Sequence, residues 1–184
     1  MEKLYTIFAA ISDETNEGWI WLSDPPLPPR TVVRVYDPVS GRVVFCETRS
    51  IDDNFRRQYN KREQTKKIDN SLEALVVSEW YRNALGGFAT TAKSNNQVKL
   101  NITPAGMPGW RSLRASCNHP DLAVRVGTRL GVLGAWLGLV GLIPPLFDIA
   151  RIQGVCRVQY LIAVAVVGAI IGILACRGVR RPTS

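Results

Sequence analysis

The chain has 184 residues, 46% of them hydrophobic and 21% charged, and 23 Lys and Arg against 15 Asp and Glu give a net charge of +8. Apolar residues are too plentiful for a disordered chain, and the 15 Gly and 11 Pro follow no repeating period, which excludes collagen-like sequence. The charge is uneven, because residues 1–110 hold 14 basic and 13 acidic residues, whereas residues 111–184 hold 9 and 2. The surplus therefore lies beside the apolar C-terminal part, and we do not expect general binding to nucleic acid.

Residues 1–110 are predicted to form a β-rich domain. Short runs of β-branched and aromatic residues are separated by turn sequences, which is typical of strands. For the first run a signal peptide is the alternative, but the run is short and has no small-x-small cleavage site, so a strand is favoured. The predicted strands are Leu4–Ile11, Trp19–Leu22, Thr31–Tyr36, Arg42–Thr48, Ala74–Val77 and Val98–Ile102.

Turn and helix signals connect these strands. The sequence DPVSG at 37–41 predicts a hairpin turn, since proline restricts one torsion and glycine accepts a positive φ. Acidic residues near its start favour a helix over Ile51–Asn60, and a serine cap followed by Gly86-Gly87 favours another over Ser78–Leu85. The proline-rich stretch 24–29 is predicted to be an extended connector, with recognition by a proline-binding partner as the alternative.

This order of elements resembles a double-psi β-barrel. The matching stretches are VVRVYDPVSGRVV (Val32–Val44), LVVSEWYRNALG (Leu75–Gly86) and VKLNI (Val98–Ile102). The resemblance implies an α+β fold with a small barrel. Some barrels of that family cleave peptidoglycan with an acidic residue, and others bind nucleotides, peptides or partner proteins. No catalytic residue of the family can be carried over to this chain.

The sequence lacks the usual catalytic and metal-binding motifs. His119 is the only histidine, and we expect it in a linker beyond the barrel, which excludes a two-histidine metal motif and argues against a Ser-His-Asp triad. Cys46, Cys117, Cys156 and Cys176 are scattered, and neither a GxGxxG nor a Walker A sequence is present. We therefore expect no metal, no cofactor and no enzymatic activity.

A basic run begins within the predicted helix Ile51–Asn60 and continues beyond it, with aromatic residues interleaved. Phosphate groups of a nucleotide, a nucleic acid or anionic lipid could bind there, with the aromatic rings of Phe55 and Tyr59 available for stacking. The alternative is a solvated helix end that leads into a polar loop. The candidate ligand-binding residues are Arg56, Arg57, Tyr59, Lys61, Arg62, Lys66 and Lys67.

Two uncharged stretches, Leu130–Phe147 with 18 residues and Val158–Cys176 with 19, predict a transmembrane hairpin at 130–176. Each would span roughly 27 Å as a helix, close to the thickness of a bilayer core. A buried helical hairpin in a soluble protein is the alternative. A basic linker at 111–129 precedes the hairpin, and a basic tail at 177–184 follows it. The arginine bias predicts both termini in the cytoplasm, as for a bacterial inner-membrane protein.

Small residues form a stripe in each predicted span. Such stripes allow helices to approach closely in lipid. The two stripes could face each other within one hairpin, or they could join copies of the chain into a homo-oligomer. The predicted packing residues are Gly127, Gly131, Gly134, Gly138 and Gly141 in the first span and Ala165, Gly168, Gly172 and Ala175 in the second.

These features favour a non-enzymatic binding or sensor module on a membrane anchor. In one form, an anionic ligand or partner protein acts through the hairpin to alter the membrane, as two-span bacterial defence effectors do. One alternative is a peptidoglycan-acting enzyme with its barrel outside the cytoplasm. The other is a structural subunit of a membrane complex.

Overall fold

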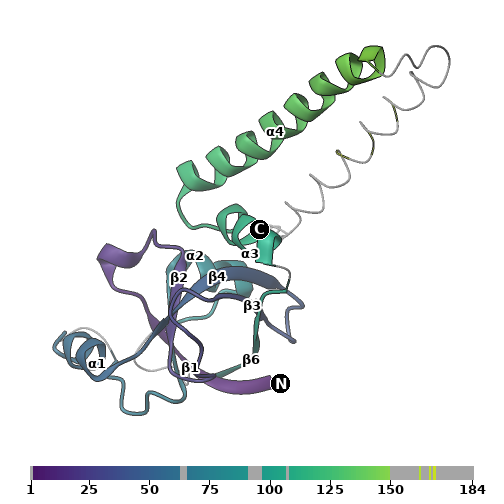
Figure 1. Cartoon of the computed structure of the whole chain (residues 1–184). Helices are drawn as coiled ribbons and strands as arrows, with labels where there is room; N and C mark the ends of the chain where they lie inside the picture. Colours follow the sequence, from purple (N-terminus) through teal and green to yellow (C-terminus); the bar gives the residue numbers. More distant parts are fainter. Residues whose placement is uncertain are drawn as a thin grey trace.

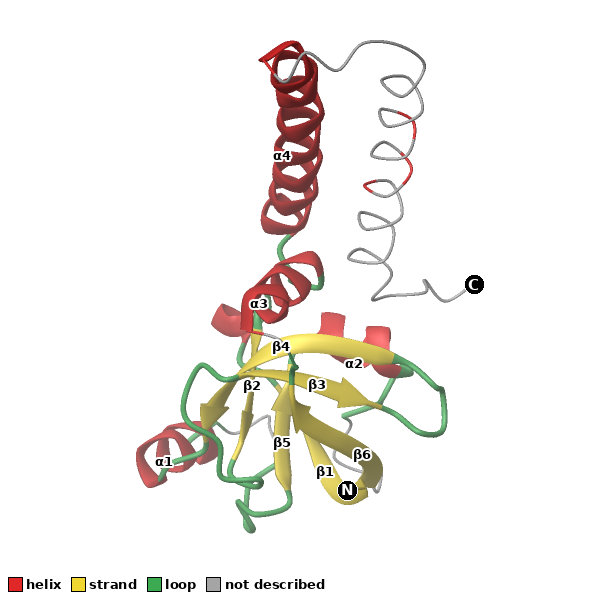
Figure 2. Cartoon of the chain, turned by 45° about the vertical axis from the view of Figure 1, so that its right-hand side comes forward, coloured by secondary structure: helices red, strands yellow, loops and turns green. Residues whose placement is uncertain are grey.

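Six strands close into a barrel in the order β1-β5-β2-β4-β3-β6 (Figure 2). This computed structural model describes residues 2–62, 66–90, 97–106 and 108–149, together with 162, 166 and 168. All six strands predicted from the sequence are confirmed, with small shifts at their ends. They are β1 (Glu2–Ala9), β2 (Trp19–Leu22), β3 (Val32–Tyr36), β4 (Val43–Ser50), β5 (Ala74–Val77) and β6 (Gln97–Pro104).

The barrel combines parallel and antiparallel pairs. β1 pairs with β5, and β2 with β4, in parallel, and the other pairings are antiparallel. Closure pairs every strand on both sides and leaves no open edge. In this closed, mixed barrel the chain resembles a double-psi β-barrel, as the sequence predicts.

Alternate residues of the strands point into the barrel or away from it. In β4, Val44 and Cys46 belong to the interior cluster, whereas Phe45 belongs to a separate cluster outside it. Glu47 is half-buried and lies on the same outward side as Phe45. The largest fully buried side chains of the interior cluster are those of Tyr5, Ile7, Ile20, Leu75, Tyr81, Leu85 and Leu100.

The β3–β4 hairpin has the turn predicted from its sequence. Tyr36 pairs with Val43, and the Asp37 carboxylate accepts hydrogen bonds from the amides of Val39 at 2.9 Å and Ser40 at 3.2 Å. Gly41 has a φ of +69°, which glycine adopts without strain. Asp37 is therefore a turn residue, and its carboxylate is committed to backbone donors.

Two short helices cover parts of the barrel, within the ranges predicted for them. Helix α1 (Asp53–Asn60) begins after Asp52, whose carboxylate accepts the amide of Phe55 at 2.6 Å. Helix α2 (Glu79–Leu85) ends at Gly86. Ser78 was predicted to cap α2, but its hydroxyl forms no hydrogen bond to the helix. The hydroxyl is buried without a partner among the described residues.

The segment predicted as a linker at 111–129 is helical except for residues 118–121. Helix α3 (Pro108–Cys117) lies on the barrel, and helix α4 (Leu122–Ile149) extends away from it (Figure 1). Pro108 is the first residue of α3 and Pro120 lies between the two helices, at places where a missing amide hydrogen costs little. Each of these prolines therefore lies at or just before the start of a helix.

Over the ranges 2–62, 66–90, 97–106 and 108–149, no helix is both long enough and apolar enough to cross a membrane. The described residues therefore do not support the predicted two-span hairpin. Its second span, Val158–Cys176, lies outside them except for residues 162, 166 and 168.

Candidate functional site

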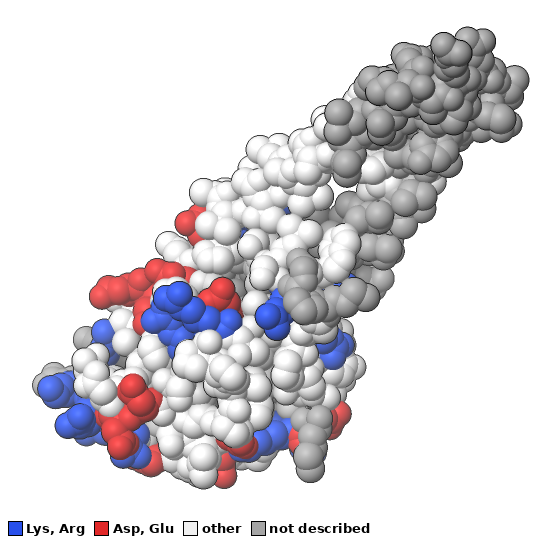
Figure 3. Space-filling view, viewed as in Figure 1, with Lys and Arg blue, Asp and Glu red and all other residues white. Residues whose placement is uncertain are grey.

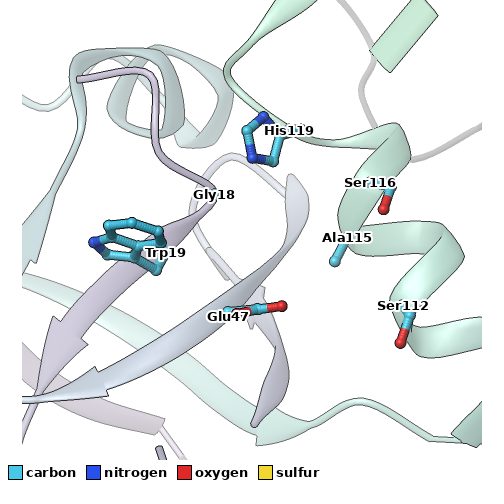
Figure 4. Close-up of a pocket in the computed structure, with 7 residues that line it drawn as sticks. All are labelled: Gly18, Trp19, Glu47, Ser112, Ala115, Ser116 and His119. Atoms are coloured by element: carbon cyan, nitrogen blue, oxygen red, sulfur yellow. The ribbon is translucent and has the colours of Figure 1, made fainter. Parts of the chain in front are cut away.

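A pocket of about 230 Å³ lies where α3 meets the outer face of the barrel (Figure 4). Trp19 of β2 and Glu47 of β4 are paired across the parallel strands and form one wall. The opposite wall comes from one face of α3, because residues 112, 115 and 116 are three and four positions apart. Its lining residues are Gly18, Trp19, Glu47, Ser112, Ala115, Ser116 and His119.

An apolar contact holds α3 in this place. Ala115 packs against a cluster formed by Val32, Phe45 and Ala105 on the outside of the barrel. The guanidinium carbon of Arg114 lies 5.3 Å from the centre of the Phe45 ring, which adds a cation–π contact. The wall formed by α3 is therefore anchored beside Glu47 by Ala115, which also lines the pocket, and by Arg114.

His119 packs onto the barrel, so the expectation that it lies beyond the barrel was wrong. A methyl group on Gly18 would come within 2.7 Å of His119 Nε2, which means that the ring rests directly on the glycine backbone. His119 Nδ1 accepts a hydrogen bond from the amide of Asp121 at 3.1 Å. The turn between α3 and α4 brings His119 back against Gly18 of the barrel. No sequence motif indicates this contact.

Burial is the main influence on the pKa of His119. Burial lowers its pKa below 6.5, Arg125 acts in the same direction, and the carboxylates of Asp121, Glu17 and Glu47 oppose the shift. Because Nδ1 accepts the Asp121 amide, the ring proton of the neutral form is on Nε2.

Several polar groups of the pocket have no partner among the residues that the structure describes. Among the described residues, neither the Glu47 carboxylate nor the hydroxyls of Ser112 and Ser116 form a hydrogen bond or ion pair. His119 is not hydrogen-bonded to either serine in that part of the chain, so no nucleophile and base are paired there. The described residues also contain no group of three His, Cys, Asp or Glu placed to hold a metal ion. The oxygens of Glu47, Ser112 and Ser116 can each accept a hydrogen bond.

The basic run predicted as a ligand site spans α1 and the segment after it. Arg56 forms an ion pair with Asp53 at 3.1 Å, and Arg57 Nε donates to the Asp53 carbonyl at 3.3 Å. Lys66 lies 6.0 Å from the centre of the Phe8 ring. Acidic and basic side chains alternate over the surface around α1 (Figure 3). The exposed members of the run are Arg57, Lys61, Lys66 and Lys67, and Arg56 and Arg62 are half-buried.

Tyr59 and Phe55 are core residues, so the predicted stacking role was wrong. Tyr59 is 1% exposed, its hydroxyl donates to the Ala9 carbonyl at 2.7 Å, and burial raises its pKa to about 12. Phe55 stacks on Trp21 at 4.0 Å between ring centres. The two residues are four positions apart, which places them on one face of α1, and that spacing could have identified them as core.

The predicted packing stripe of the first span lies on α4. A methyl group added to Gly127, Gly131, Gly134, Gly138 or Gly141 would meet no atom within 4 Å. A methyl group on Gly168, by contrast, would overlap the indole of Trp136. The partly covered face of α4 holds Arg125, Thr128, Val132 and Trp136. Ala165, Gly172 and Ala175 lie outside the described residues.

No protein-family model matches this chain, and no curated protein matches its sequence. Among solved structures, the chain is similar to the crystal structure of a computationally designed double-psi β-barrel protein, msDPBB_sym2. The identity is 9% and the TM-score 0.37, with 56% of this chain and 100% of the designed chain covered.

Proposed function

We propose that this chain is a non-enzymatic binding module whose barrel recognises a ligand or partner and whose apolar C-terminal segments attach it to a membrane. The observation that carries the proposal is the apolar surface of α4. Leu130, Leu133 and Leu137 are 61%, 51% and 61% exposed, and their spacing of three and four residues places them on one face of the helix. An exposed apolar helix face is stabilised by apolar surroundings, since each Å² removed from water contributes about 25 cal/mol.

The charges beside this surface support attachment to a membrane. Residues 130–147 of α4 carry no charge, whereas Arg125 and Arg129 lie at the end of the helix nearest the barrel. Arginines at that level can contact anionic headgroups, with about 1 kcal/mol for each residue near the surface. The second uncharged stretch, Val158–Cys176, would complete a two-span hairpin.

Membrane attachment is tested by sedimentation. We expect the full chain to remain in the membrane pellet after an alkaline carbonate wash. The double variant Leu133→Lys/Leu137→Lys should move into the supernatant, since lysine at a helix centre costs about 2.5–3.5 kcal/mol in a membrane. Leu72→Lys is the matched control, because Leu72 is 58% exposed on the barrel. A wild-type chain found in the supernatant would overturn the proposal.

Self-association through the glycine stripe is the second part of the proposal. Trp136 is about 200° around the helix from Gly134 and from Gly138, at 100° per residue. The contact of Trp136 with Gly168 therefore uses the face of α4 opposite the stripe. This supports packing between copies of the chain over packing of the two stripes within one hairpin.

Cross-linking of the chain in membranes tests the stripe. We expect Gly134→Leu/Gly138→Leu to reduce the cross-linked oligomer several-fold, since leucine side chains keep the two backbones apart. Ala135→Leu adds a leucine side chain beside the stripe and should leave the oligomer in place. Equal cross-linking in all three proteins would rule out this interface.

A further inference from the structure

The pocket between α3 and the barrel contains a carboxylate that has no counter-ion among the described residues. Glu47 extends from the outer side of β4, and its carboxylate is turned towards α3 (Figure 4). It forms no ion pair within the part of the chain that the structure describes. A half-buried carboxylate is less well solvated than an exposed one, so it gains more from a cation that reaches it.

The nearby arginines are engaged elsewhere. The guanidinium of Arg49 lies 3.6 Å from the centre of the Trp19 ring, and that of Arg125 lies 5.0 Å from the centre of the Trp80 ring. Arg114 lies over Phe45. Each is held by an aromatic ring, and none lines the pocket.

The remaining polar groups of the pocket suit a donor-rich ligand. The hydroxyls of Ser112 and Ser116 can accept hydrogen bonds, and the neutral ring of His119 adds no positive charge. The pocket lining therefore carries the single negative charge of Glu47. We propose that this pocket binds a small organic cation through an ammonium or guanidinium group, with Glu47 as its counter-ion and Ser112 and Ser116 as hydrogen-bond acceptors.

The size of the pocket sets the size of the ligand. A volume of about 230 Å³ exceeds the roughly 150 Å³ cavity that accommodates benzene. A cation bearing a short alkyl chain fits within it. The inference rests on the proposed binding function of the barrel, and it is independent of the attachment of α4 to a membrane.

A bound cation would link the two walls of the pocket. Glu47 belongs to the barrel, whereas Ser112 and Ser116 belong to α3, which leads through His119 and Asp121 into α4. A ligand that contacts both walls stabilises the position of α3 on the barrel. Ligand binding therefore favours the arrangement in which α3, and the turn from α3 into α4, are held against the barrel.

Titration of the ¹⁵N-labelled full chain in zwitterionic micelles tests the site, with amide chemical shifts as the readout. We expect ethylguanidinium chloride and ethylammonium chloride to shift the amides of Glu47, Ala115, Ser116 and His119 in a saturable manner. Glu47→Gln should weaken this binding roughly tenfold or more, as loss of a charged hydrogen-bond partner does. Glu73→Gln, an exposed carboxylate ahead of β5, should bind like the wild type.

Three outcomes would overturn the proposal. The first is that these amides do not shift. The second is an equal response in Glu47→Gln and Glu73→Gln, which would mean that Glu47 does not hold the cation. The third is the same pattern of shifts with sodium acetate or sodium chloride. Failure of membrane attachment is observed separately in the sedimentation experiment, and the titration is then repeated without detergent.

Discussion

Gly18 and His119 form a direct contact between the barrel and the turn that leads into α4. The histidine ring lies where a side chain at position 18 would be, and Gly18 itself is buried. This contact depends on the absence of a β-carbon and does not require an unusual backbone conformation. It leads to a prediction about stability that concerns one methyl group.

We expect Gly18→Ala to lower the free energy of unfolding by about 1–3 kcal/mol, the usual cost of overpacking a well-packed contact. Gly106→Ala is the matched control, since a methyl group there meets no atom within 4 Å. Urea denaturation of both variants provides the measurement. His119→Ala should restore part of the loss in the Gly18→Ala background. Equal stability of the two alanine variants would contradict the contact.

The pKa of His119 predicts a pH dependence of stability. Burial lowers this pKa below 6.5, so the unfolded chain binds a proton more readily than the folded one as pH falls. The contribution of the neutral His119 to the free energy of unfolding is fully present above pH 6.5. It declines as pH falls from 6.5 through the pKa of the folded state. Protonation of Nδ1 also removes the acceptor of the Asp121 amide.

Urea midpoints measured between about pH 5 and 7.5 test this expectation. His119→Gln should flatten the pH profile in that window. Since the chain has one histidine, NMR titration of its ring gives the pKa directly. A value of 6.5 or higher would contradict the buried, neutral state.

At the scale of single elements, α1 shows how one short helix combines core and surface residues. Phe55 and Tyr59 pack against Phe8, Ala74 and Val76 on the outside of the barrel. The charged side chains occupy the remaining faces. The apolar face of α1 therefore determines its position, and its charges remain in contact with solvent.

We expect Tyr59→Ala to cost about 3–5 kcal/mol, because it removes a buried aromatic ring and leaves a cavity. Lys61→Ala, at the exposed end of the same helix, should change stability by less than about 0.5 kcal/mol. Thermal or urea denaturation distinguishes them. If Tyr59→Ala were as stable as Lys61→Ala, Tyr59 would not be a core residue.

At the scale of the whole molecule, the orientation of the barrel relative to the membrane separates the proposed function from the enzyme alternative. Cys46 and Cys117 are buried, so neither is suited to labelling. Val39 in the β3–β4 turn is 87% exposed. A cysteine at this position reports on the barrel surface.

We expect Val39→Cys, with Cys156 and Cys176 replaced by serine, to resist a membrane-impermeant maleimide in intact bacteria and to react after lysis. This expectation rests on the arginine bias, which predicts a cytoplasmic barrel. Labelling of intact cells would place the barrel outside and favour the peptidoglycan-acting alternative. The same chain without Val39→Cys measures the background.

The accuracy of the sequence-based predictions differed between local and long-range features. The β3–β4 hairpin was predictable because its turn residues act on their own neighbours, as the Asp37 contacts with Val39 and Ser40 show. The role of Tyr59 was also accessible from its spacing to Phe55. The pocket was not, because Glu47 and Ser112 are distant in sequence and belong to no motif.

The sequence by itself determined the strands, the hairpin turn, the starts of the short helices and the apolar character of the C-terminal part. Each of these depends on neighbouring residues, through backbone torsions, capping and hydrophobic periodicity. Only the tertiary structure decided how the strands other than β3 and β4 pair, that α3 packs beside Glu47, and that His119 lies on Gly18. Those contacts join segments that are far apart in sequence and are brought together by the closed barrel. A local sequence pattern carries no direct information about which distant segments meet.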